Sequence, residues 1–318
     1  METVKWVFLA GDGRVRPGWR ALLYLPLFAV MMAPFVFLIR TALGPGEHGE
    51  GIGIRALLGA VAGCVCALLA AAALLRLLDR RPFKNLGVWF YEGWGKELAL
   101  GLGGGLVLMT VMVAPLAAGG WIELRLATIE PLGLLTGLAW SAGILVPAAA
   151  GEEFLFRGYP FQRLMDAWGA MIPAVGISAL FGLAHANNPN ATWFSTVNTV
   201  LAGIWLAVAY LKTRALWLPI GVHFSWNFVM GFGYGLPISG NVLPWKLVEA
   251  TPGGPVWLTG GDYGPEGSIL CTGVLVVVTV WMMRSDWLRV APQMAAQLNG
   301  AGASVASTAT MNVAERNP

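Results

Sequence analysis

The sequence predicts an all-α fold: a polytopic membrane helix bundle of about eight transmembrane helices, with both termini in the cytoplasm. Three observations lead to this prediction. Of the 318 residues, 57% are hydrophobic and only 12% are charged, whereas about a quarter are charged in an average soluble domain. Apolar runs of about 20 residues, long enough to cross a hydrocarbon core of about 30 Å, recur along the chain. Lys and Arg gather in alternate loops between these runs.

The apolar runs give the expected order of the helices. The first run starts after roughly 20 residues of mixed sequence and exceeds signal-peptide length, so we expect it to remain as a span. The third run contains a glycine-rich stretch, Gly101 with Gly103 to Gly105, which indicates close helix packing. The candidate spans are 21–39, 54–78, 97–118, 132–150, 171–186, 193–211, 216–233 and 268–283.

Basic residues orient the bundle. They precede the first span and follow the second, fourth, sixth and eighth, whereas the opposite loops hold only Arg40, Arg55, Arg125 and Lys246. The positive-inside rule therefore puts both termini in the cytoplasm. A net charge of +3 is too small to indicate a nucleic-acid partner.

The extramembrane segments differ in composition. Residues 1–20 read as an irregular cytoplasmic lead-in, and residues 291–318, rich in Ala, Ser, Thr and Asn, as a disordered tail. The loop 234–267 is dense in Gly and Pro and carries Trp245 and Trp257, which is typical of a non-cytoplasmic cap with aromatic anchors.

Ionisable side chains are costly inside apolar helices and are usually functional there. Glu152 and Glu153 lie at the end of an apolar run, and Arg157 follows four residues after the second glutamate. Glu153 and Arg157 share one helical face, which favours a supporting ion pair at the membrane edge. Adjacent residues are about 100° apart on a helix, so Glu152 is expected to face elsewhere and to have another role.

Two of the three histidines, His185 and His223, lie in or beside apolar segments, and Asn227 shares a helical face with His223. A turn near Trp168 would join two helices as a hairpin. Glu152 lies 16 residues before this turn and His185 lies 17 after it. Both would then stand about 24–26 Å from the turn and could touch. This requires the helix of Glu152 to continue to about Asp166, with a kink at Pro147.

These groups suit hydrolysis. A low-dielectric surrounding disfavours the charged form of a carboxyl group, which favours a general base for water. A neighbouring histidine can orient that water or protonate a leaving amine. A second histidine and an asparagine amide can donate hydrogen bonds to a tetrahedral oxyanion.

Three motifs in order resemble those of the CAAX-protease and bacteriocin-processing family of intramembrane proteases: a double glutamate followed by Arg, Phe-x-x-x-His, and His-x-x-x-Asn. The similarity runs from about 133 to 232. Residues 11–20 are also similar to the lead-in of bacterial members, which implies a bacterial plasma membrane. The resemblance divides the chain into the lead-in, N-terminal helices over 21–132, a catalytic core over 133–232, an extramembrane loop with the last helix over 233–290, and the tail.

The resemblance implies an intramembrane endopeptidase that acts on a membrane-associated protein or peptide. Glu152 would activate water with His185, and His223 with Asn227 would form the oxyanion site. Glu153 with Arg157 would be supporting residues. The implied mechanism needs no cofactor, although zinc at Glu152, His185 and His223 stays open.

Other functions are compatible with the same residues. Buried Glu and His side chains also form proton relays in transporters and ion carriers, although the two halves lack paired broken helices. A non-catalytic immunity or scaffold protein could keep the fold, and Asn227 could instead bridge two helices by a hydrogen bond.

Overall fold

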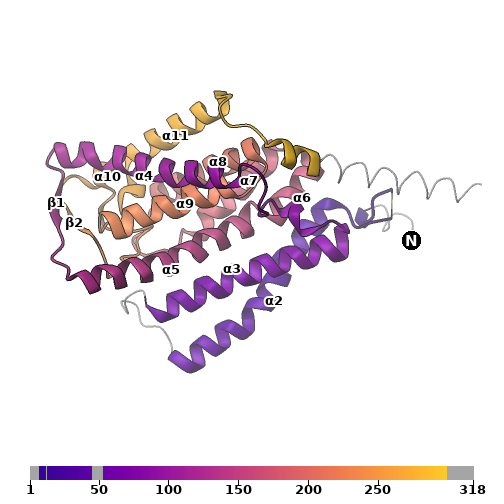
Figure 1. Ribbon diagram of the computed structural model, residues 1–318, viewed down its shortest axis with the longest axis horizontal. Coiled ribbons are helices and arrows are strands. Elements are labelled where there is room, and N and C mark those ends of the chain that lie inside the picture. Colours follow the sequence, from indigo (N-terminus) through magenta and orange to yellow (C-terminus); the bar gives the residue numbers. More distant parts are fainter. Residues whose placement is uncertain (1–6, 12, 45–52, 299–318) are drawn as a thin grey trace, which may run out of the picture.

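The computed structural model describes residues 7–11, 13–44 and 53–298, and this part of the chain is mostly helical (Figure 1). The long helices are α2 (Pro17–Leu43), α3 (Ile54–Leu74), α4 (Trp94–Ala118), α5 (Pro131–Phe156), α6 (Tyr159–Trp168), α7 (Met171–Ala184), α8 (Trp193–Thr213), α9 (Trp217–Phe228) and α11 (Ile269–Arg284). Short helical turns are η1 (Leu75–Asp79), η2 (Phe83–Leu86), η3 (Val229–Gly233), α10 (Val256–Thr259), η4 (Gly261–Tyr263) and η5 (Pro265–Gly267).

The prediction of an all-α chain is wrong in one detail. Strands β1 (Ile122–Leu126) and β2 (Val248–Pro252) form an antiparallel two-stranded sheet in which Ile122 is opposite Pro252. The sheet lies at the end of the bundle opposite the N-terminus (Figure 1). It joins the connection after α4 to the loop before α11, a long-range pairing that apolar periodicity does not report.

A helix forms at each of the eight predicted span positions, but the described residues contain five helices long and apolar enough to cross a membrane. These are α2, α3 continued by η1, α4, the combined α5 and α6, and α8. Helices α7, α9 and α11 have 14, 12 and 16 residues. A 14-residue helix rises only about 21 Å. Helices α7, α9 and α11 are therefore each shorter than a hydrocarbon core of about 30 Å.

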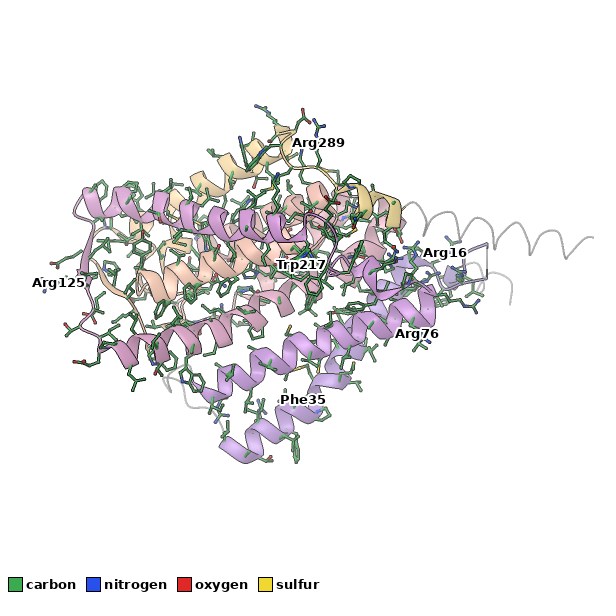
Figure 2. The ribbon with its side chains drawn as sticks, viewed as in Figure 1. Arg16, Phe35, Arg76, Arg125, Trp217 and Arg289 are labelled. Carbon is green, nitrogen blue, oxygen red and sulfur yellow. The ribbon has the colours of Figure 1, made fainter. Side chains whose placement is uncertain are left out.

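Helix α5 lies at the centre of the packing. It contacts α3 on one side and α9 on the other, while α2 packs on α3. Figure 1 shows α2 and α3 as a pair on one side of α5, with α4, α9 and α11 on the other. Helix α2 exposes large apolar side chains such as Val30 and Phe37, and Phe35 lies on its outer surface (Figure 2). Such a surface is expected of a helix that faces lipid.

Glycines allow α4 and α9 to approach closely. A Cβ on Gly101 would lie 2.5 Å from the Leu218 carbonyl oxygen, and one on Gly105 would lie 2.7 Å from the Trp226 backbone nitrogen. The predicted packing role is thus confirmed for these two glycines. It is wrong for Gly103, where a Cβ would meet nothing within 4 Å.

The two ends of the bundle carry different basic groups. Arg16 and Arg76 lie at the end near the N-terminus, and Arg125 lies at the opposite end beside the sheet (Figure 2). Within the first end, the buried Arg20 donates a hydrogen bond of 2.6 Å to Asp79. The predicted lead-in therefore ends early, because α2 begins at Pro17, a residue well suited to a first helical position.

Part of the predicted disordered tail is ordered. Residues 292–298 are helical, and Met294 is buried against an aromatic cluster that includes Tyr91. Gln297 donates a hydrogen bond of 2.8 Å to Asn85. Burial of Met294 by a distant segment explains this difference, since the tail alone lacks apolar periodicity. Residues 299–318 lie outside the described part of the chain.

Candidate active site

The predicted catalytic residues meet at one cavity. It has a volume of about 580 Å³, and Glu152, His185, His223 and Asn227 all line it. Helices α5, α7 and α9 supply these side chains, and α8 and α11 complete the wall. The four residues span 76 positions of the sequence, counted from 152 to 227, and come from three different helices of the bundle or their ends.

The two adjacent glutamates of α5 face different surroundings, as the helical geometry predicts. The side chain of Glu152 is 35% exposed at the cavity, whereas that of Glu153 is fully buried. Gly151 brings α5 close to α3, because a Cβ there would lie 3.0 Å from the Cα of Cys64. The lack of a side chain at Gly151 thus allows the end of α5 to pack closely against α3.

The predicted continuous helix from Glu152 to Asp166 is wrong. Helix α5 ends at Phe156 and α6 begins at Tyr159, with Pro160 near its start. Proline has no backbone N–H for the bond to Phe156 and its ring clashes with the preceding turn, so the helix breaks there. Pro147 remains inside α5.

The predicted hairpin contact is confirmed despite this break. The chain turns at Gly169, which has a φ of 72°, and α7 returns alongside the end of α5. His185 Nε2 lies 3.8 Å from Glu152 Oε2. The rings of Phe156 and Phe181, which are likewise symmetric about the turn, lie 5.1 Å apart edge to face.

His185 is held at the C-terminus of α7. Its Nδ1 lies 2.8 Å from the carbonyl oxygen of Phe181, and since a carbonyl only accepts, Nδ1 carries the hydrogen. Nε2 then faces Glu152. Phe181 also packs on the His185 ring, with centroids 4.6 Å apart.

His223 is held by the second glutamate. Its Nδ1 donates to Glu153 Oε1 at 2.8 Å, while its Nε2 lies 3.7 Å from Glu152 Oε2. A carboxylate at one imidazole nitrogen fixes the tautomer and stabilises the ring when it becomes positive. Helical spacing predicted a partner of Glu153 in Arg157 only. The contact between Glu153 and His223 was not predicted.

Arg157 contacts the residues that hold the two histidines in place. Its guanidinium lies 3.1 Å from Glu153, donates to the Gly203 carbonyl oxygen of α8 at 3.0 Å, and stacks on the Phe181 ring at 4.5 Å. The predicted ion pair is therefore confirmed. Both side chains are fully buried.

Asn227 lies one turn beyond His223 on α9, and both line the cavity, as their spacing predicts. Its side chain makes no hydrogen bond to any other described residue. The alternative that Asn227 bridges two helices is therefore not supported. An amide without a protein partner is available to a substrate.

Comparison with known proteins agrees with the motifs. Residues 134–229 match the family model described as Type II CAAX prenyl endopeptidase Rce1-like. We refer to residues 134–229, which are similar to this family, as the Rce1-like segment. It contains all six predicted site residues and runs from α5 to the end of α9. No curated protein and no solved structure matches the chain.

The other wall of the cavity includes residues outside the Rce1-like segment. Ser239, Asn241 and Glu266 come from the loop before α11, and Asn188 follows α7. The predicted cap thus forms part of the cavity. Trp245 packs on Trp140 with ring centroids 5.6 Å apart. No spacing rule in this Gly- and Pro-rich loop indicated its polar contribution.

The Rce1-like segment was also a possible zinc site. In the part of the chain that the structure describes, no group of three or more His, Cys, Asp or Glu side chains has the arrangement of a metal site. Glu152 Oε2 lies 3.7 and 3.8 Å from the two imidazole nitrogens.

Proposed function

We propose that this protein is an intramembrane endopeptidase that hydrolyses a peptide bond of a membrane-associated protein or peptide, using water activated by Glu152. One observation carries the proposal. Glu152 Oε2 is buried and accepts no hydrogen bond from the described residues, yet it lies near the Nε2 atoms of His185 and His223. A carboxylate oxygen with free lone pairs beside two imidazoles in a cavity is what a general base for water requires.

The first step activates water. Distances of 3.7 and 3.8 Å exceed a direct hydrogen bond, but they leave Glu152 Oε2 within reach of a water that also contacts an imidazole. Glu152 accepts a proton from this water, which His185 orients through Nε2. The water oxygen then bonds to the carbonyl carbon of the substrate, and the carbonyl oxygen becomes the oxyanion.

The second step stabilises and resolves this intermediate. His223, protonated at both nitrogens, donates through Nε2, and Asn227 donates through its amide. Glu153 stabilises the positive ring from Nδ1. The carbon–nitrogen bond then breaks, and the proton held by Glu152 passes to the leaving nitrogen. The products are a free carboxyl group and a free amine, so one water is consumed for each bond cleaved.

The experiment compares the wild-type protein with Glu152→Gln, both reconstituted in lipid vesicles. The substrates are peptides that end in a prenylated CAAX sequence, following the name of the matched family model, and lipid-anchored peptides without prenyl groups. We expect wild-type cleavage of at least one class and its loss in Glu152→Gln with unchanged thermal unfolding. Full cleavage by the variant would overturn the mechanism.

The same vesicles test the alternative functions. A transporter or ion carrier would accumulate a solute or dissipate a proton gradient without cleaving peptide, and Glu152→Gln would change that flux. A scaffold or immunity protein would do neither, although it would bind its partner. Cleavage by the wild type excludes both alternatives as the main activity.

A further inference from the structure

The cavity has a second carboxylate in addition to Glu152. Glu266 lies in η5, outside the Rce1-like segment, and lines the same cavity. The proposed hydrolysis does not use it. Since most of the cavity wall is apolar, with side chains such as Ile144 and Leu206, a carboxylate there needs a physical explanation.

Neutral donors hold this carboxylate in position. Glu266 Oε1 accepts a hydrogen bond of 3.0 Å from the Trp226 indole, and Oε2 accepts bonds of 2.8 and 2.6 Å from the Ser239 backbone N–H and hydroxyl. A carboxylate offers about four acceptor sites. Three are used within the protein, so one is left for a ligand.

The negative charge of Glu266 has no basic partner among the described residues, in contrast to Glu153, which pairs with Arg157. Burial, followed by the nearby Glu266 carboxylate, raises the pKa of Tyr263 above its ordinary value. In an apolar cavity, electrostatic attraction is stronger than in water. A cation that enters is therefore attracted to Glu266.

The position of Glu266 relates it to the reacting groups. Its donor Trp226 adjoins Asn227 and follows His223 by three residues on α9, a rise of about 4.5 Å. Glu266 and the four proposed reacting residues line one cavity, so a group bound at Glu266 would belong to the same bound substrate.

We propose that Glu266 determines specificity by binding a positively charged group of the substrate, either a lysine or arginine side chain or a free α-amino group, near the scissile bond. This inference rests on the proposed function for its biological meaning. Alternatively, Glu266 could serve only to position the loop through its hydrogen bonds to Trp226 and Ser239. The experiment distinguishes substrate binding from loop positioning.

The first measurement is binding without cleavage. Glu152→Gln protein in detergent micelles is titrated with lipid-anchored peptides that carry one lysine, or the neutral norleucine, at successive positions. We expect the lysine peptide to bind about 10- to 100-fold more tightly at one position. A parallel set with acetylated and free N-termini distinguishes a side chain from an α-amino group. Equal binding of all these peptides would overturn the proposal.

Variants then assign the preference to the carboxylate. Glu266→Gln, in the same background, should lose the preference for lysine and bind the norleucine peptide as before. Asp262→Asn, an exposed loop position, is the matched control and should keep the preference. Equal weakening of both peptides by Glu266→Gln would mean loop positioning only.

Cleavage by protein that retains Glu152 separates the two proposals. If the Glu152→Gln protein prefers the lysine peptide but the wild type cleaves none, the proposed function fails and the cation site stands. If the wild type cleaves and Glu266→Gln leaves the ratio of kcat/KM for lysine and norleucine peptides unchanged, the assignment of Glu266 fails alone. Loss of that ratio, by about 10-fold or more, supports both.

Discussion

His223 Nδ1 lies 2.8 Å from Glu153 Oε1, while Nε2 of the same ring lies 3.7 Å from Glu152 Oε2. One imidazole thus contacts two adjacent carboxylates of α5 that have very different surroundings. The buried Glu153 orients the ring, and the cavity-lining Glu152 shares its other side with the proposed water. This relationship explains how two adjacent glutamates can have different roles, one structural and one in the proposed reaction.

Glu153→Gln should lower kcat, because a neutral amide cannot stabilise a positive His223 ring. We expect a fall of about 100-fold with little change in KM. The measurement is a double-mutant cycle with His223→Gln, since residues that act as a unit give non-additive losses. Fully additive losses in correctly folded variants would contradict the coupling.

Arg157→Met should destabilise the protein by about 3–5 kcal/mol, because it leaves Glu153 as a buried charge with its ion-pair partner removed. Arg157→Lys keeps the charge but cannot make the same forked contacts to Glu153 and Gly203, so a smaller loss of about 1–3 kcal/mol is expected. Denaturant unfolding in micelles measures both values. Wild-type stability of Arg157→Met would refute this role.

Asn227→Ala should reduce kcat by about 100- to 1000-fold, the usual effect of removing one oxyanion donor. Its unfolding temperature should equal that of the wild type, because the side chain makes no hydrogen bond to another described residue. Kinetics and thermal unfolding on the same preparation provide the check. A lower unfolding temperature with unchanged kcat would indicate a structural role instead.

Gly105→Ala should separate α4 from α9, because the new Cβ would lie 2.7 Å from the Trp226 backbone nitrogen. We expect a loss of about 1–3 kcal/mol from overpacking, together with reduced activity, since α9 carries His223 and Asn227. Gly103→Ala is the matched control in the same helix, where nothing lies within 4 Å of the added methyl. Equal stability of the two variants in denaturant unfolding would argue against close packing.

Metal chelators should leave peptide cleavage unchanged if protein groups alone perform the reaction. The measurement is kcat/KM before and after dialysis against EDTA and 1,10-phenanthroline, with metal content determined on the same samples. Loss of activity that added zinc restores would require a metal at Glu152, His185 and His223. The general-base mechanism would then need to be replaced.

Much of the fold could be predicted because each helix of a membrane bundle corresponds to one contiguous apolar run of the sequence. Composition and apolar runs predicted a helical membrane protein and located the helices. The number of full-length spans could not be predicted in this way, since it depends on the positions of single helix ends. Hydropathy averaged over a window does not register them.

The candidate site was predictable to a different degree for each residue. Glu152 and His185 lie at equal separations from one turn, so helical rise alone predicts their contact. His223 and Asn227 were tied to each other by spacing, but their meeting with Glu152 came from the family resemblance. Asn188 and Glu266 carried no periodic or motif signal.

By itself, the sequence determined a membrane helix bundle with a buried polar cluster and the pairing of Glu152 with His185, because a constant rise per residue converts separation along the chain into distance. Only the tertiary structure decided that Glu153 holds His223, 70 residues away, and that the loop before α11 brings Glu266 to the same cavity. Contacts of that kind depend on how whole helices pack, and neither residue type nor spacing along the chain specifies it.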